Sequence, residues 1–264
     1  MKKCKDTFYS ETRILAMKKI IFGVFLVGLY GAIGPMLSVD HLREEAFFSR
    51  TFLSKIGFIY CMGWLQFYKY LSMWLIAEGA LILAGMGTVE TKDRKTGEVS
   101  LDHSHCTNVK VGLISGCNVM LEFVDGFNIN TNKWVMNYCF KRLAFLGNKN
   151  ISQLASLGFL ALWHGFSIGY FTCFFYEFMT IFAEKELIAR GVLVRGYKGN
   201  KIRAILQKLV QVQTIGAYCM IDFNLLEWNV YYPVWKSVYF YGHLFVIFEI
   251  LLVFVLPKNK VKTN

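Results

Sequence analysis

ISQLASLGFLALWHGFSIGY, the stretch at residues 151–170, decides how the rest of the chain is interpreted. Upstream of it lie FNINTNKWV at 127–135 and the basic amphipathic run FKRLAFLGNKN at 140–150. His164 lies in the middle of a segment that is apolar enough to lie in a bilayer. An ionisable group at that depth costs free energy that an apolar residue would not, so His164 is our first candidate functional residue.

The composition of the 264-residue chain indicates a membrane protein. Hydrophobic residues make up 55% of the chain and aromatic residues 17%, which exceeds what a soluble core can bury. Three prolines permit long helices, and 22 glycines suit close helix packing in lipid. We predict an all-α fold, a multi-pass transmembrane helical bundle that forms one membrane-embedded domain over 1–264, with the candidate site in 127–183.

The formal charge of +11 is better explained by membrane topology than by nucleic acid. Lys and Arg residues cluster at the ends of apolar segments, where they stay cytosolic and meet anionic lipid headgroups. We therefore predict membrane lipids as partners and no nucleic acid. Seven cysteines form no short-spaced framework and are predicted to be free thiols. The HSHC run at 103–106 lacks a second ligand pair, so we predict no metal site.

Length selects the candidate spans, because a helix needs about 20 apolar residues to cross the hydrocarbon. We expect a span at 20–37 after a polar lead, and two more at 205–226 and 235–256. The apolar run 51–87 is too long for one straight crossing, so we expect a break or elbow at Lys69.

The other segments complete the predicted layout. Residues 88–110 are the most polar and are expected to form an exposed loop, whereas 111–127 suit a short helix or a re-entrant piece that enters the site. A helix lying partly in the interface is predicted at 132–150. Two helical pieces or one kinked helix are predicted over 151–183, with His164 near the bend and pointing inward. Glu78 lies deep in an apolar segment, and we expect it to hydrogen-bond between helices.

Three motifs in this order resemble those of the membrane-bound O-acyltransferase family. They are Phe127-Asn128 followed by NTNKW, the run FKRLAFLGNK, and LWHGFSIGY. The similarity is greatest to the lysophosphatidylcholine and lysophospholipid acyltransferase branch, and it extends from about Trp64 to the C-terminus. It implies the C-terminal part of a longer fold that lacks N-terminal helices here, so we expect one side of the cavity to be open.

The resemblance implies that His164 and Asn128 are the catalytic pair, with acyl-CoA as co-substrate and no cofactor or metal. A neutral imidazole can accept the proton of a hydroxyl group, and an amide can donate to an oxyanion or fix the substrate hydroxyl. Asn130 and Asn132 compete with Asn128 on composition alone, and only the match to the family motif favours Asn128.

Further residues are expected to contact the substrates. Lys141 and Arg142 are candidates for binding the phosphates of coenzyme A, with solvated interfacial charge as the alternative. The remaining substrate-binding or chamber-wall candidates, taken from the family's aromatic and histidine motifs, are Trp163, Tyr170, Phe175, Tyr239, Phe240 and His243. Trp235 stands where the family's later motif has Tyr, which leaves the role of His243 open.

The resemblance predicts transfer of a fatty acyl group to the sn-2 hydroxyl of a lysophospholipid, as in phospholipid remodelling. We expect a location in the endoplasmic reticulum membrane with a cytosolic C-terminus, because Lys260 and Lys262 complete a K-x-K-x-x retrieval pattern. The sequence is compatible with a homo-oligomer. Two alternatives stay open: an inactive truncated membrane protein that binds lipid or a partner, and an acyltransferase whose acceptor is a protein.

Overall fold

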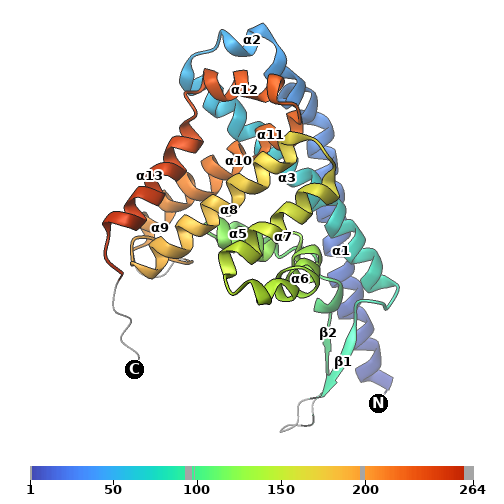
Figure 1. The fold of residues 1–264 in the computed structure, drawn as a ribbon. Coiled ribbons are helices and arrows are strands. Elements are labelled where there is room, and N and C mark those ends of the chain that lie inside the picture. Colours follow the sequence, from blue (N-terminus) through green and yellow to red (C-terminus); the bar gives the residue numbers. More distant parts are fainter. Residues whose placement is uncertain (1, 93–96, 98, 197–199, 259–264) are drawn as a thin grey trace.

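Helices dominate the computed structural model, which describes residues 2–92, 97, 99–196 and 200–258 (Figure 1). The two longest helices, α1 (Lys2–Ile33) and α3 (Phe52–Leu83), run side by side in opposite directions. The later helices pack against α3 and against one another. The predicted all-α class is therefore confirmed for the main body of the chain.

Shorter helices build the rest of the bundle. They are α2 (Glu45–Phe48), α4 (Val111–Gly116), α5 (Met120–Gly126), α6 (Ile129–Tyr138), α7 (Lys149–His164), α8 (Ile168–Ala189), α9 (Lys201–Lys208), α10 (Gly216–Tyr218), α11 (Met220–Leu225), α12 (Trp228–Ser237) and α13 (Tyr241–Val255). Four short 3-10 segments join some of these, at Gly34–Leu37, Val39–Arg43, Ser104–Cys106 and Phe140–Leu146. A π-helix, Leu209–Ile215, connects α9 to α10.

Glycines permit the closest helix contacts, as the sequence predicts. A Cβ atom on Gly79 of α3 would lie 2.7 Å from the carbonyl oxygen of Ala16 on α1. A Cβ atom on Gly63 would lie 2.8 Å from the Cα of Ala217 on α10. Small residues let helix backbones approach this closely, which increases van der Waals contact where lipid gives no hydrophobic driving force.

The expected break at Lys69 is wrong. Helix α3 continues through this residue from Phe52 to Leu83 without interruption. The Lys69 ammonium lies 6.0 Å from the ring centre of Tyr30 and 5.4 Å from that of Tyr70. These aromatic faces and the exposed position accommodate the charge, so the backbone does not have to bend.

The loop expected at 88–110 contains regular structure. Strands β1 (Val89–Lys92) and β2 (Val99–Asp102) pair antiparallel, with Val89 opposite Asp102. Val and Thr favour strands, which explains why a polar segment forms a hairpin here. Exposure of this hairpin was predicted correctly, but its strands were missed.

The two C-terminal spans are also less regular than predicted. Residues 205–226 are divided among α9, the π-helix, α10 and α11. Helices α12 and α13 meet at an angle of 75°, where Tyr239 and Phe240 adopt φ values of 53° and 52°. Of the described helices, only the one in Ser10–Arg43 is alone long and apolar enough to cross a membrane, and α12 with α13 qualifies as a bent pair.

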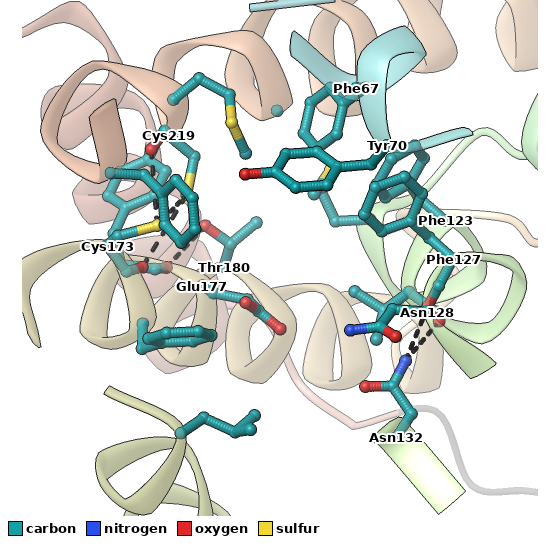
Figure 2. A pocket seen from close by; sticks show the side chains of 18 of the residues that line it. Phe67, Tyr70, Phe123, Phe127, Asn128, Asn132, Cys173, Glu177, Thr180 and Cys219 are labelled. Carbon is teal, nitrogen blue, oxygen red and sulfur yellow. Dashed lines mark hydrogen bonds between the residues drawn. The ribbon is translucent and has the colours of Figure 1, made fainter. Parts of the chain in front are cut away.

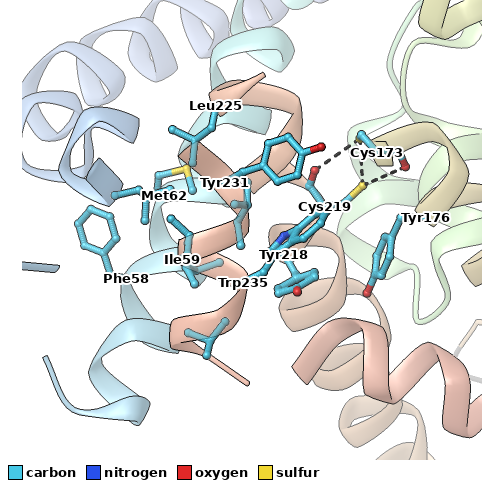
Figure 3. Close-up of a cluster of buried hydrophobic side chains, with 14 of the residues drawn as sticks. Phe58, Ile59, Met62, Cys173, Tyr176, Tyr218, Cys219, Leu225, Tyr231 and Trp235 are labelled. Atoms are coloured by element: carbon cyan, nitrogen blue, oxygen red, sulfur yellow. Dashed lines mark hydrogen bonds between the residues drawn. The ribbon is translucent and has the colours of Figure 1, made fainter. Parts of the chain in front are cut away.

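An aromatic core fixes α8, α10, α11 and α12 against α3 (Figure 3). Tyr231 and Trp235 of α12 lie 4.7 Å apart between ring centres, and Trp235 stacks on Tyr218 of α10. Next to them the thiols of Cys173 and Cys219 lie 3.2 Å apart without a disulfide. The prediction of free thiols is confirmed for the cysteines whose side chains are described.

Gly169 should not tolerate a side chain. Its backbone N–H donates to the carbonyl oxygen of Leu226 at 2.8 Å, and a Cβ atom would lie 2.7 Å from the Cα of Leu226. We expect Gly169→Ala to push α8 from α11 and to lower the free energy of unfolding by about 1–3 kcal/mol. Thermal unfolding in detergent measures this change.

Gly158→Ala is the matched control, because no atom lies within 4 Å of its added Cβ. It should leave the melting temperature unchanged or raise it slightly. Equal melting temperatures for the two variants would contradict the close contact between α8 and α11.

Candidate functional site

His164 is the last residue of α7, at the point where the chain turns into α8. Gly165 ends α7 with φ at 139°, a backbone conformation that a residue with a side chain rarely adopts. Helix α8 begins at Ile168, directly after Ser167. The predicted break near His164 is therefore confirmed.

Aromatic rings surround the imidazole of His164. Its ring centre lies 5.4 Å from that of Tyr170, 5.5 Å from Phe174 and 5.4 Å from Phe223. Within the described residues no protein atom hydrogen-bonds to the imidazole. The ring lines a cavity, yet His164 is exposed rather than enclosed, so the expectation that it points inward holds only in part.

Asn128 forms the N-terminal cap position of α6 in a left-handed conformation, with φ 51° and ψ 47°. Asparagine adopts this conformation more readily than most residues because its short polar side chain can bond locally. Its Oδ1 accepts a hydrogen bond from Nδ2 of Asn108 at 3.4 Å. In the described part of the chain, Asn128 Nδ2 donates to no protein atom, so it is available for a substrate oxygen.

Asn108 also holds the backbone that follows Asn128. The N–H of Ile129 donates to the carbonyl oxygen of Asn108 at 2.9 Å, and the N–H of Asn130 donates to Oδ1 of Asn108 at 2.9 Å. These two bonds satisfy amides in the first turn of α6, which no earlier carbonyl of that helix can reach. They fix the unusual backbone conformation of Asn128.

Glu78 in turn fixes Asn108. Oε1 of Glu78 accepts from the backbone N–H of Asn108 at 2.6 Å and of Val109 at 2.9 Å. Oε2 pairs with Nζ of Lys19 on α1 at 2.6 Å, and only 3% of the Glu78 side chain is exposed. The predicted hydrogen bond between helices is confirmed, and its charged partner on α1 is an addition that the sequence did not reveal.

Both candidate residues line one cavity, with an empty volume of about 1100 Å³ including space open to the outside. Figure 2 shows the part of this cavity around Asn128. Helices α3, α5, α6, α7, α8, α10 and α11 and the π-helix contribute to its walls. The lining residues are Phe67, Tyr70, Trp74, Met120, Phe123, Val124, Phe127, Asn128, Thr131, Asn132, Leu160, His164, Cys173, Phe174, Tyr176, Glu177, Thr180, Ile215, Gly216, Cys219, Met220 and Phe223. The fold therefore places Asn128 and His164 on the walls of one cavity.

The competing asparagines have other partners. Nδ2 of Asn132 donates to the carbonyl oxygens of Val124 and Phe127 at 2.9 and 2.8 Å, so its amide supports the turn between α5 and α6. Asn130 is exposed and lines a separate groove on the other side of α6. Asn128 is thus the amide of the three that faces the cavity with a free donor.

Several predicted substrate-binding residues lie elsewhere. Trp163 lines the groove between α6 and α7, and Phe175 lines a second apolar groove between α7 and α8. The expectation that Phe175 forms part of the chamber wall is therefore wrong, because α8 turns it to the opposite face. Lys141 and Arg142 are exposed on the 3-10 segment after α6, and neither lines the cavity.

His243, the histidine of the family's later motif, contacts residues behind the cavity wall. Nδ1 of His243 lies 2.8 Å from the hydroxyl of Tyr218, and its ring centre lies 4.4 Å from that of Trp235. Tyr170 does not line the main cavity but packs against His164. Tyr239 is exposed, so the expectation that it is a chamber-wall residue is wrong.

Glu177 is the cavity residue that sequence reasoning missed. It projects from α8 into the cavity together with Cys173 and Thr180, which share its face of the helix (Figure 2). The available signal was a single acidic residue inside the apolar run that follows His164, spaced three and four residues from these neighbours.

Asn108 should control the order of the Asn128 turn. We expect Asn108→Ala to remove hydrogen bonds to residues 128 and 130, and so to raise backbone amide exchange over 128–131 by about tenfold. Hydrogen–deuterium exchange measured by mass spectrometry tests this. Asn137→Ala, on the exposed side of α6, is the control, and equal exchange in the two variants would show that Asn108 does not hold the turn.

Comparison with known proteins gives a consistent set of relatives. Residues 13–195 match the family model described as MBOAT, membrane-bound O-acyltransferase family. The chain is 38% identical over 253 residues to lysophospholipid acyltransferase 5 of Homo sapiens, covering 92% of this chain and 50% of that protein.

More distant organisms give similar matches. Lysophospholipid acyltransferase 5 of Drosophila melanogaster is 35% identical, with 84% of this chain and 47% of that protein covered. The lysophospholipid acyltransferase of Saccharomyces cerevisiae is 27% identical, with 80% and 35% covered. The chain thus spans about half, or less, of the length of these curated relatives.

Proposed function

The chain belongs to the membrane-bound O-acyltransferase family, and on this premise we propose that it transfers a fatty acyl group from acyl-CoA to the sn-2 hydroxyl of a lysophospholipid. It is a membrane protein, as the family is. The names of its relatives support a lysophospholipid as acceptor. Among acceptors we propose lysophosphatidylcholine, and among roles phospholipid remodelling.

One observation carries the proposal: His164 and Asn128 come from different helices and line the same cavity. The imidazole and the free amide donor are the two groups that acyl transfer to an alcohol requires. The cavity is also largely aromatic, which suits an amphipathic acceptor better than a small polar one.

In the proposed reaction, His164 takes the proton of the sn-2 hydroxyl as its oxygen attacks the thioester carbonyl carbon. A carbon–oxygen bond forms, and the carbonyl oxygen gains negative charge that Nδ2 of Asn128 stabilises by a hydrogen bond. The carbon–sulfur bond then breaks, and the proton passes from the imidazolium to the sulfur. The products are a diacyl phospholipid and free coenzyme A, and no acyl-enzyme intermediate is required.

The proposal includes a location. We place the chain in the endoplasmic reticulum membrane as a multi-pass protein with a cytosolic C-terminus, supported by the basic residues around α9. Lys141 and Arg142 remain candidates for the coenzyme A phosphates only if the donor extends beyond the cavity. The retrieval pattern at 260–264 lies outside the described residues.

A second function is a non-enzymatic membrane protein that binds lipid. The exposed position of His164 and the two additional apolar grooves favour it. A third candidate, acyl transfer to a protein, shares the cavity and the proposed base. One assay that offers both a lysolipid and a peptide as acceptor separates these three candidate functions.

We expect His164→Ala to reduce acyl transfer by about 10²–10⁴-fold, because the base is lost, and Asn128→Ala by about 10²–10³-fold. Microsomes containing each variant are supplied with labelled acyl-CoA, lysophosphatidylcholine and an acceptor peptide, and labelled phospholipid and labelled peptide are measured. His105→Ala is the control, since this exposed histidine lies beside the β1–β2 hairpin.

Equal activity of wild type and His164→Ala would exclude His164 as the base. Labelled peptide without labelled lipid would favour the protein acceptor. Binding of the lysolipid with no transfer above the host background would favour the non-enzymatic protein.

A further inference from the structure

Glu177 is a carboxylate in the cavity that the proposed reaction does not use. It lies in the middle of α8, between the turns that carry Cys173 and Thr180, and all three line the cavity (Figure 2). Among the described residues, none forms a hydrogen bond or ion pair with it. An unpaired carboxylate in an apolar setting is costly, so this position favours a positively charged ligand as its partner.

Aromatic rings form another wall of the same cavity. Phe127 lies 4.8 Å from Trp74, 5.4 Å from Phe67 and 5.0 Å from Phe123 between ring centres, which makes one continuous aromatic surface. Figure 2 shows Phe67, Phe123 and Phe127 of this surface apart from the α8 wall that carries Glu177. The faces of such rings attract cations, and quaternary ammonium groups above all.

No Lys or Arg among the described lining residues competes with a cationic ligand for this space. The lining residues of the cavity that the structure describes include no Lys and no Arg, and Glu177 is their one carboxylate. A phosphate or carboxylate at the end of a headgroup would meet Glu177 with like charge. An ammonium group would meet opposite charge on one side and aromatic faces on the other.

We propose that Glu177 and the Phe67–Trp74–Phe123–Phe127 surface bind the cationic headgroup of the acceptor lipid, and that Glu177 determines headgroup specificity. The inference rests on the proposed function, because it assumes that the acceptor's glycerol hydroxyl lies at His164. The acceptor is then a zwitterionic lysophospholipid with a choline or ethanolamine group. Glu177 is not a catalytic residue in this assignment, since it touches the headgroup and not the reacting atoms.

The test separates binding from catalysis. Lysophospholipid analogues that lack the sn-2 hydroxyl, share one acyl chain and carry phosphocholine, phosphoethanolamine or phosphoserine cannot react. Their dissociation constants are measured on the purified full chain in detergent, through quenching of tryptophan fluorescence, with Trp74 in the cavity wall. The same three headgroups on hydroxyl-bearing lysolipids give kcat/KM in parallel.

The wild-type chain should bind the choline and ethanolamine analogues about tenfold more tightly than the serine analogue. Glu177→Gln, which keeps size and polarity but removes the charge, should reduce this ratio to about one. Its kcat with the choline lysolipid should change less than its KM. Glu90→Gln makes the same chemical change on the exposed hairpin and should keep the wild-type ratio.

A ratio near one in the wild type, or an unchanged ratio in Glu177→Gln, would overturn the inference even if His164 proves to be the base. Selective binding without any acyl transfer would instead overturn the proposed function and leave the headgroup site standing. Glu177→Asp, which restores the charge, should recover part of the preference. A merely misfolded variant would lose affinity for all three headgroups equally.

Discussion

The buried carboxylate of Glu78 is the interaction on which the candidate site depends. It joins Lys19 on α1 to the backbone of Asn108 and Val109, which lie after the hairpin. A buried charge of this kind is tolerated only with partners on all sides, and removal of one partner costs several kcal/mol. Through Asn108, the same contact fixes the left-handed turn at Asn128. The charge pair between two long helices thereby determines where the amide donor faces.

A second buried carboxylate has the same kind of role at the other side of the cavity. Glu184 of α8 accepts hydrogen bonds from the N–H groups of Met120 and Leu121 at 2.7 and 2.9 Å. These N–H groups stand at the start of α5, where no earlier carbonyl of the helix can accept from them and where a negative charge is favourable. Helix α5 then leads directly into Phe127 and Asn128. Glu184 therefore links α8, which carries Glu177 and follows His164, to α5, which leads to Asn128.

The sequence predicted the parts of the site that depend on local patterns. The helix break near His164, the interhelical role of Glu78 and the helical class follow from apolar length and from a charged residue inside an apolar segment. Lys69 was misjudged because one of its aromatic neighbours, Tyr30, comes from another helix, α1. Phe175 was misplaced because a motif gives spacing but not which face of α8 meets the cavity. Glu177 was missed for the same reason, since its importance appears only when α5 and α8 enclose one space.

The central claim is that His164 and Asn128 act together on one transition state, and a double-mutant cycle tests it most directly. The values of kcat/KM for acyl transfer to lysophosphatidylcholine are measured for wild type, His164→Ala, Asn128→Ala and the double variant. If the two residues act as one unit, the double variant should be no slower than His164→Ala within a few-fold. Losses that multiply fully would show that the two residues act independently, and would contradict the account.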